Sequence, residues 1–270
     1  MHDEKGMAVV MEILEFGNRE NKTLLLIHGF QSPYQIWNEF IEFFKKDYHV
    51  VVPILEGHNP KVNEEFCSFE ESAKKIEDYC INSFGREIYA MYGMSLGGVL
   101  ASHIWQNRRL KVKNVILESS PLVSFSGLMT FILTKQYLLL THKTQQREEK
   151  IVNQAVNSII SKENLPEFLE LMDNMTDETI VNYIKALGKY KLPTDIEMAD
   201  TQLFYFHGTK MNEMLAQKTA KYIKTNYPKA EIICFKGKGH CEDSLISPNV
   251  MIEVLKKILV NNGEGRQDET

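Results

Sequence analysis

The feature that most constrains this chain is the alternation of short apolar runs with stretches whose apolar residues repeat at helical spacing. The strand-like runs lie at 8–14, 24–27, 49–55, 88–92, 112–117, 202–206 and 231–235. The helical stretches lie at 37–44, 69–80, 96–105, 213–222 and from 250 onward. Apolar strands interleaved with helices indicate a mostly parallel sheet covered on both faces, because the crossover connections place helices there. The sequence therefore predicts an α/β fold.

One long segment interrupts this alternation. Between 122 and 194 no convincing strand is found, yet three groups of apolar residues follow helical spacing: Val152, Val156 and Ile159; Leu165, Phe168, Leu169 and Met172; Ile180, Ile184 and Leu187. A segment of this length is too long to be a structureless loop in a compact domain. We therefore expect a core formed by residues 1–121 and 195–270, with a helical cap at 122–194 inserted between two core strands.

The composition limits the classes of partner. The 270 residues carry 31 basic and 36 acidic side chains, which gives a net charge of −5. This balance, with no block of like charge, argues against binding to nucleic acid or to an anionic membrane surface. The N-terminal residues are polar, and the longest apolar stretch, around 138–140, is far shorter than the roughly 20 residues that span a bilayer. We expect a soluble, cytoplasmic protein without stable membrane insertion, and the oligomeric state is open.

The cysteines give no sign of a disulfide or a metal site. They lie at 67, 80, 234 and 241, with no CxxC pair and no metal-ligand spacing. We expect reduced thiols. Cys241, although it is next to His240, is expected to be a small packing residue rather than a catalytic thiol.

The candidate nucleophile is Ser95. The stretch GMSLG at 93–97 matches G-x-S-x-G, and it closes an apolar strand and opens a helix. The motif alone also occurs in ordinary glycine-rich turns, but the strand-turn-helix setting is typical of a nucleophile elbow. Gly93 and Gly97 let the backbone turn sharply and lift the Ser95 hydroxyl above the edge of the sheet.

The candidate base is His240. It ends the loop FKGKGH at 235–240, after the final strand, where glycines allow the loop to carry the imidazole back toward Ser95. A serine hydroxyl is a weak nucleophile unless a neighbour accepts its proton, and histidine titrates near neutral pH. Of the other histidines, His28 is expected to brace its own loop and His58 to be structural.

The loop HGFQ at 28–31 follows an earlier strand and is the candidate oxyanion loop. Acyl transfer through a tetrahedral intermediate needs donors directed at the developing oxyanion. The backbone N–H groups of Phe30 and of Leu96, directly after the nucleophile, are the natural pair.

The HGF run, the GMSLGG elbow, the GKGH loop and the strand order together resemble the α/β-hydrolase superfamily, nearest to its esterase and monoacylglycerol-lipase-like members. The likeness covers nearly the whole chain except the cap. It implies a mostly parallel sheet of about eight strands, a cap between strands six and seven, a Ser-His-acid triad and no cofactor or metal. It does not imply a substrate, because this fold serves many reactions.

The triad acid is the open question. The superfamily commonly places its carboxylate three residues after the glycine that ends the seventh strand, and that position here is Met211. A thioether cannot accept the N–H of an imidazolium as a carboxylate does. Two carboxylates are the main alternatives: Glu213 in the same loop, and Glu118 at the end of the preceding core strand. A dyad without an acid, or some other acid, is left open as well.

These residues predict a serine hydrolase of carboxylic esters that acts through an acyl-Ser95 intermediate. The alternatives are a thioesterase or an acyltransferase with the same site, or a homologue that binds a small ligand without turnover. Apolar residues near the start of the cap are expected either to line an acyl pocket or to form the cap's own core: Leu128, Met129, Phe131, Ile132, Leu133 and Leu138 to Leu140.

Overall fold

The fold is built on one central sheet. The computed structural model describes residues 11–62, 64–156 and 158–261. Its strands are β1 Ile13–Phe16, β2 Thr23–Ile27, β3 His49–Pro53, β4 Glu87–Met94, β5 Lys111–Glu118, β6 Gln202–Gly208 and β7 Glu231–Phe235. Their order is β1-β3-β2-β4-β5-β6-β7. Strand β1 pairs antiparallel with β3, and the other pairs are parallel, which confirms the predicted α/β class.

The strand count and the first boundary differ in detail from the expectation. About eight strands were expected, and the described residues form seven. The first run was expected at 8–14, whereas β1 begins at Ile13 and pairs through Phe16 with Val50 of β3. Residues 8–10 of the expected run lie outside the described residues. The core strands six and seven of the expectation correspond to β5 and β6.

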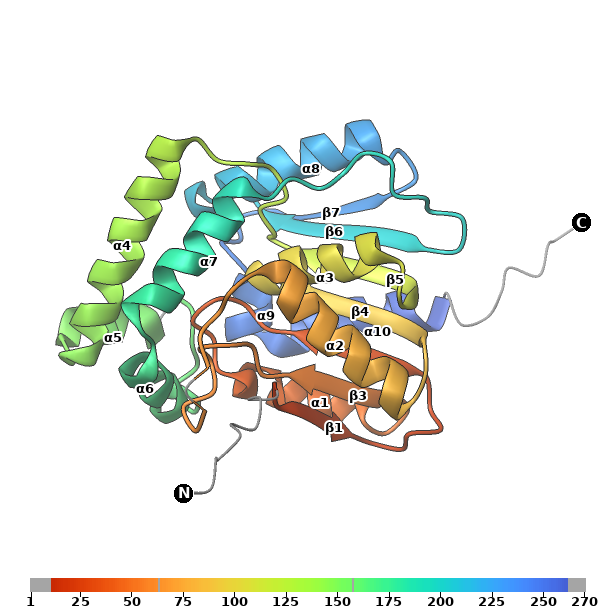
Figure 1. Ribbon diagram of the computed structural model, residues 1–270, viewed down its shortest axis with the longest axis horizontal. Coiled ribbons are helices and arrows are strands. Elements are labelled where there is room, and N and C mark those ends of the chain that lie inside the picture. Colours follow the sequence, from red (N-terminus) through yellow and green to blue (C-terminus); the bar gives the residue numbers. More distant parts are fainter. Residues whose placement is uncertain (1–10, 63, 157, 262–270) are drawn as a thin grey trace, which may run out of the picture.

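The helices cover both faces of the sheet (Figure 1), with α2 and α3 on one face and α1 and α10 on the other. At the start of α2 the Ser68 hydroxyl caps the helix, since it accepts a hydrogen bond from the Glu71 N–H. The bounds are η1 Tyr34–Trp37, α1 Asn38–Phe44, α2 Phe69–Ser83, α3 Leu96–Asn107, α4 Gly127–Gln145, α5 Glu149–Val156, α6 Leu165–Asn174, α7 Asp177–Lys189, η2 Met211–Glu213, α8 Met214–Asn226, α9 Glu242–Ile246 and α10 Pro248–Asn261.

The register of the parallel strands brings several chain segments to one edge of the sheet. Ile27 pairs with Gly93, Met94 with Glu118, and Gly208 with Phe235, so the strands end almost level. Loops that follow these strands therefore meet at the carboxyl edge, which is where open α/β sheets usually bind ligands.

Helices α4 to α7 lie between β5 and β6 in sequence and beside the carboxyl edge of the sheet in space (Figure 1). Helical structure was expected for α5, α6 and α7, but α4 was not foreseen as a helix. Its apolar residues occur on all sides, so it lacks the one-sided period that marks an amphipathic helix. No helix in the described ranges is long and apolar enough to cross a membrane.

Candidate active site

Ser95 occupies a sharp turn between β4 and α3. Its φ is 53° and its ψ is −114°, a backbone conformation that residues other than glycine rarely adopt. The Ser95 N–H donates to the carbonyl of Glu118 at 2.8 Å, which holds the turn against the end of β5. A Cβ on Gly97 would lie 2.2 Å from the carbonyl oxygen of Ile27, so only glycine lets α3 begin this close to β2. The turn has the geometry expected of a nucleophile elbow.

His240 reaches Ser95 from the loop after β7. Its Nε2 lies 2.9 Å from the Ser95 Oγ, across a sequence separation of 145 residues. The loop is positioned by backbone bonds from Thr209 and Lys210 to the carbonyl of Lys238, at 2.9 and 3.0 Å. A Cβ on Gly208 would lie 2.2 Å from that same carbonyl, so a glycine at the end of β6 permits this close approach.

Glu213 is the carboxylate in contact with His240. It ends the short helix η2, and its Oε1 lies 2.7 Å from the His240 Nδ1. The other oxygen, Oε2, accepts hydrogen bonds from the Gly208 N–H at 2.7 Å and the Ser119 hydroxyl at 2.8 Å. Burial by itself would raise the pKa of Glu213, but the hydrogen bond and charge of His240 and the two further donors outweigh it, and the pKa is lowered. The carboxylate is therefore ionised at neutral pH.

This arrangement also fixes the tautomer of His240. An ionised carboxylate accepts, so the His240 Nδ1 carries the hydrogen and Nε2 is left with a lone pair toward the Ser95 hydroxyl. The serine, the imidazole and the carboxylate thus form one continuous line of hydrogen bonds.

Glu118, the alternative acid, does not touch His240. Its Oε2 accepts from the Ser244 hydroxyl at 2.6 Å and from the Tyr92 hydroxyl. Burial raises the pKa of Glu118 to about 7, against the opposing effect of these two donors. Met211, at the position where the superfamily commonly has its acid, is 85% exposed and points away from the site. The geometry therefore brings Glu213 to the base, and it leaves Glu118 in a separate buried hydrogen-bond network.

The candidate oxyanion loop lies directly beside the nucleophile. A Cβ on Gly29 would be 3.5 Å from the Cβ of Ser95. Within the described residues, neither the Phe30 N–H nor the Leu96 N–H donates to another protein group. Both backbone donors are therefore available near the Ser95 hydroxyl.

The two histidines near this loop are structural, as expected. His28 bonds the carbonyl of Gly29 through Nδ1 at 2.9 Å, and its Nε2 accepts from the Leu55 N–H at 3.2 Å. Burial lowers the pKa of His28 to about 4, so the ring is neutral at neutral pH. The His58 ring lies 4.9 Å from the His28 ring and is likewise buried.

Similarity to solved structures identifies the fold of this chain. No family model matches the chain. A protein from Desulfitobacterium hafniense that is assigned to the α/β-hydrolase family has a TM-score of 0.73 at 22% identity, over 92% of this chain and 100% of that one. The chain has the α/β-hydrolase fold. A carboxylesterase structure from Nitrososphaera gargenis, with a TM-score of 0.75 at 16% identity, covers 94% of this chain and 95% of that chain.

Sequence relatives of this chain are distant, but the similarity extends over most of their length. Proteins from the Corby and Lens strains of Legionella pneumophila, both described as pimeloyl-[acyl-carrier protein] methyl ester esterases, are 22% identical to it over 224 residues. The matched region covers 80% of this chain and 87% of each relative.

Cys241, next to His240, behaves as a packing residue, as expected. Cys241 is buried, and burial followed by the charges of Glu118 and Glu213 raises its pKa well above the ordinary value. Such a thiol is not a nucleophile at neutral pH. In the described part of the chain, no group of three or more His, Cys, Asp or Glu side chains is arranged to hold a metal ion.

One expectation for the inserted helices is wrong in part. Leu128, Phe131, Ile132 and Leu139 of α4 are 50 to 70% exposed, so they form neither a closed acyl pocket nor the core of the inserted segment. They lie on the side of α4 opposite to Tyr137, whose ring lies 5.3 Å from that of Phe30. Because apolar residues occur on all sides of α4, the sequence alone does not show which of its sides is buried.

Sequence reasoning also missed several residues that hold the oxyanion loop. The Gln31 side chain donates to the Thr141 hydroxyl of α4, and the Phe30 ring lies 5.2 Å from that of Tyr183 on α7. Nothing local in the sequence links these residues, because Gln31 and Thr141 are 110 positions apart.

Proposed function

We propose that this chain is a serine hydrolase of carboxylic esters, with Ser95 as nucleophile, His240 as general base and Glu213 as the orienting acid. The observation that carries the proposal is the unbroken line from Glu213 Oε1 to His240 Nδ1, at 2.7 Å, and from His240 Nε2 to Ser95 Oγ, at 2.9 Å. A nucleophile within hydrogen-bond reach of a base, itself oriented by a third group, is the arrangement that activates a serine.

The proposed reaction follows from the protonation states of these groups. Ser95 Oγ attacks the ester carbonyl while His240 Nε2 takes its proton, and the Glu213 carboxylate stabilises the imidazolium that forms. The Phe30 and Leu96 N–H groups then stabilise the oxyanion. His240 returns the proton to the leaving alcohol, and a water molecule activated by the same imidazole releases the acid from Ser95.

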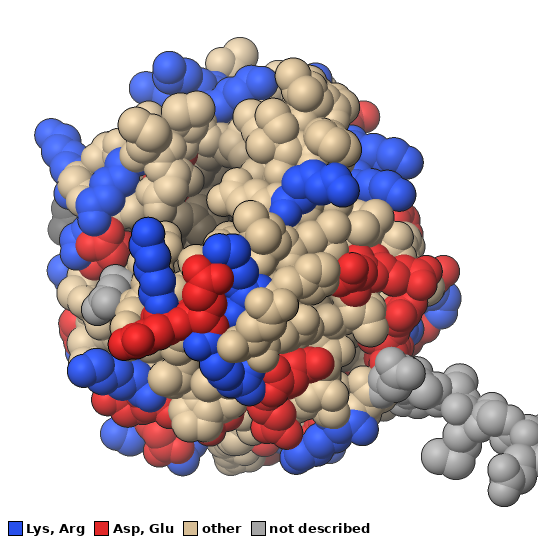
Figure 2. Space-filling view, turned by 90° about the vertical axis from the view of Figure 1, so that its left-hand side faces the viewer, with Lys and Arg blue, Asp and Glu red and all other residues tan. Residues whose placement is uncertain are grey.

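The inserted segment is proposed to act as a cap over this site. Helices α4 and α7 reach the oxyanion loop through Thr141 and Tyr183. The face that carries the inserted helices is hollowed, and most side chains around the hollow are uncharged (Figure 2). An uncharged hollow favours a small, apolar acyl group. The named activities of the relatives, which include methyl ester and carboxylic ester hydrolysis, support the same substrate class.

The proposal is tested by labelling with a fluorophosphonate probe, with intact mass used to count adducts. The wild type is expected to take up one adduct, while Ser95→Ala and His240→Ala take up none. A series of p-nitrophenyl esters from acetate to decanoate then gives kcat and KM. If the folded wild type is not labelled, or if Ser95→Ala is labelled equally, the proposed function is wrong.

A further inference from the structure

Gln31 holds an unfavourable backbone conformation next to a proposed oxyanion donor. It directly follows Phe30, and its φ is 56°, in the left-handed region that residues with a side chain rarely adopt. Such a conformation persists only where the surroundings fix it. The contacts of Gln31 show what fixes it.

Three hydrogen bonds hold Gln31, and the longest is from its side-chain amide to the Met175 Sδ at 3.6 Å. Its backbone N–H donates to the His58 Nε2 at 2.9 Å. Its side-chain amide donates to the Thr141 Oγ1, on α4, at 2.7 Å. The Thr141 hydroxyl hydrogen is used within α4, toward the carbonyl of Tyr137 at 2.8 Å, so its oxygen is free to accept from Gln31. Gln31, His58 and Thr141 are buried, so losing the Thr141 oxygen would leave the buried Gln31 amide with only its long bond to the Met175 sulfur.

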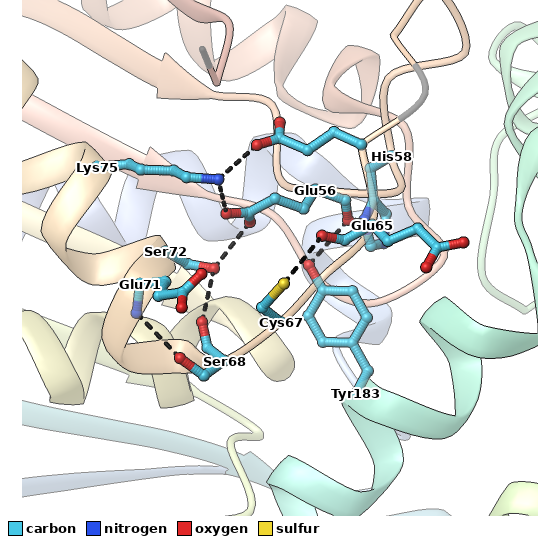
Figure 3. Close-up of polar contacts among 10 residues, drawn as sticks. Glu56, His58, Glu65, Cys67, Ser68, Glu71, Ser72, Lys75 and Tyr183 are labelled. Atoms are coloured by element: carbon cyan, nitrogen blue, oxygen red, sulfur yellow. Dashed lines mark hydrogen bonds and ion pairs between the residues drawn. The ribbon is translucent and has the colours of Figure 1, made fainter. Parts of the chain in front are cut away.

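His58 is itself held in the tautomer that this contact requires. Because Nε2 accepts from Gln31, Nδ1 carries the hydrogen and donates to the carbonyl of Glu56 at 3.0 Å. The same carbonyl accepts from the Tyr183 hydroxyl of α7 at 2.9 Å (Figure 3). Burial, followed by the proximity of His28, lowers the pKa of His58 well below its ordinary value, so Nε2 remains an acceptor at neutral pH.

Hydrogen bonds fix the orientation of the peptide that carries the Phe30 N–H and of the peptide that follows it. The carbonyl of that peptide belongs to Gly29 and accepts from the His28 Nδ1 at 2.9 Å, and a planar trans peptide then directs the Phe30 N–H the opposite way. The next peptide is fixed by the bond from Gln31 to His58. A shift of α4 would pull on Gln31 and so disturb the direction of the Phe30 N–H.

We propose that Gln31 is a positioning residue that couples the packing of α4 to the oxyanion hole, through its hydrogen bond to Thr141. The Phe30 N–H is correctly placed only while α4 rests against the loop. This inference rests on the proposed function, because it assigns the Phe30 N–H to an oxyanion. It gives the inserted segment a role in the chemical step in addition to covering the site.

The chain offers a matched pair of variants for the test. Thr141→Val removes the acceptor with little change in shape. Thr144→Val, one turn further along α4, removes a buried hydroxyl that bonds only to the Leu140 carbonyl, at 2.8 Å, so it reproduces every other effect of the first change. Thr141→Ser keeps the hydroxyl and is the conservative rescue.

Thr141→Val is expected to lower kcat by roughly tenfold. The Phe30 N–H would still be present, but it would be displaced from the position in which it stabilises the oxyanion. KM and the pH dependence of kcat/KM should be unchanged, because the oxyanion forms only in the transition state and the triad is untouched. Thr144→Val and Thr141→Ser are expected to retain the wild-type kcat. Gln31→Leu combined with Thr141→Val should lower kcat no further than Gln31→Leu alone, since both changes remove the same hydrogen bond between Gln31 and Thr141.

If the packing of α4 affects the oxyanion hole, then occupation of the oxyanion hole must equally affect α4. Phosphonylation of Ser95 places a tetrahedral group in the oxyanion hole, and it is expected to slow amide hydrogen exchange in α4 of the wild type and of Thr144→Val. The slowing should be smaller in Thr141→Val. This readout does not depend on turnover.

The results of these experiments distinguish a failure of the proposed coupling through Gln31 from a failure of the proposed function. If the wild type is labelled at Ser95 but Thr141→Val matches Thr144→Val in kcat and in α4 exchange, the coupling is wrong and the proposed function stands. A wild type that is not labelled at Ser95 overturns both. A parallel loss in Thr141→Val and Thr144→Val would mean that α4 packing matters without the bond to Gln31, which also overturns the coupling.

Discussion

Glu213 contacts His240 directly, with its Oε1 2.7 Å from Nδ1, although it lies two positions beyond the place where the superfamily commonly has its carboxylate. The short helix η2 makes this possible, because it turns Met211 outward and Glu213 inward, where the Gly208 N–H and the Ser119 hydroxyl complete its hydrogen bonds. A carboxylate two positions further along the loop thus contacts His240.

The first prediction separates the two candidate acids. Glu213→Gln is expected to lower kcat by about 10³- to 10⁴-fold, because an amide neither holds the productive tautomer of His240 nor stabilises the imidazolium. Glu118→Gln should leave kcat close to the wild-type value, because an amide oxygen can still accept from Tyr92 and Ser244. Steady-state kinetics on one p-nitrophenyl ester measure both. A large loss only in Glu118→Gln would assign the role to Glu118 instead.

A second prediction concerns the position that Met211 occupies. In the double variant Glu213→Gln with Met211→Asp, the new carboxylate would lie on the exposed side of η2, since the Met211 side chain is 85% exposed. No recovery of kcat over Glu213→Gln alone is therefore expected. Recovery would show that the loop can adopt the more usual arrangement when its acid is moved back.

The general architecture could be predicted from the sequence because each signal was local. The apolar runs, the GMSLG elbow and the capping residue Ser68 are each read within a few positions, and the structure places them as strand, turn and helix start. The choice between Glu213 and Glu118 could not be made in this way. It depends on the register of β5 against β6 and on the turn of η2, both of which are set by packing between distant segments.

Helix α4 and its contacts show a second limit. The segment has a capping serine, Ser126, and no glycine or proline from 128 to 145, so a helix could have been proposed from these signals. Its buried contact from Thr141 to Gln31 could not, because a threonine among leucines gives no sign of its partner.

The third prediction concerns the pH dependence of stability. Burial raises the pKa of Glu118 to about 7, from 4.5 in the unfolded chain. Between these two values the folded protein keeps a proton that the unfolded chain has lost, so this group lowers the free energy of unfolding as pH rises, and the effect is complete above pH 7. Glu118→Gln removes the effect.

As pH rises from about 5 to about 8, the free energy of unfolding of Glu118→Gln should therefore increase relative to that of the wild type. The increase should be up to about 3 kcal/mol, since one pKa unit corresponds to about 1.4 kcal/mol. Urea denaturation of both proteins at the two pH values measures the difference. Parallel changes in the two proteins would mean that Glu118 is ionised across this range and that its hydrogen bonds outweigh its burial.

The last prediction tests the close approach of α3 to β2 at the elbow. Gly97→Ala would place a Cβ 2.2 Å from the Ile27 carbonyl oxygen and 2.5 Å from that of His28, and neither backbone group can rotate away. A loss of about 2–3 kcal/mol in the free energy of unfolding is expected, as for other overpacked positions. Labelling of Ser95 should slow as well, because the strand that carries the oxyanion loop is pushed away from the nucleophile.

Gly127→Ala is the matched control, since nothing lies within 4 Å of a Cβ at that position at the start of α4. It is expected to stabilise the protein by about 0.4–1 kcal/mol, because alanine has fewer unfolded conformations to lose. Urea denaturation and the rate of fluorophosphonate labelling measure both variants. If Gly97→Ala were as stable and as reactive as Gly127→Ala, the tight contact between the elbow and β2 would not be what holds Ser95 in place.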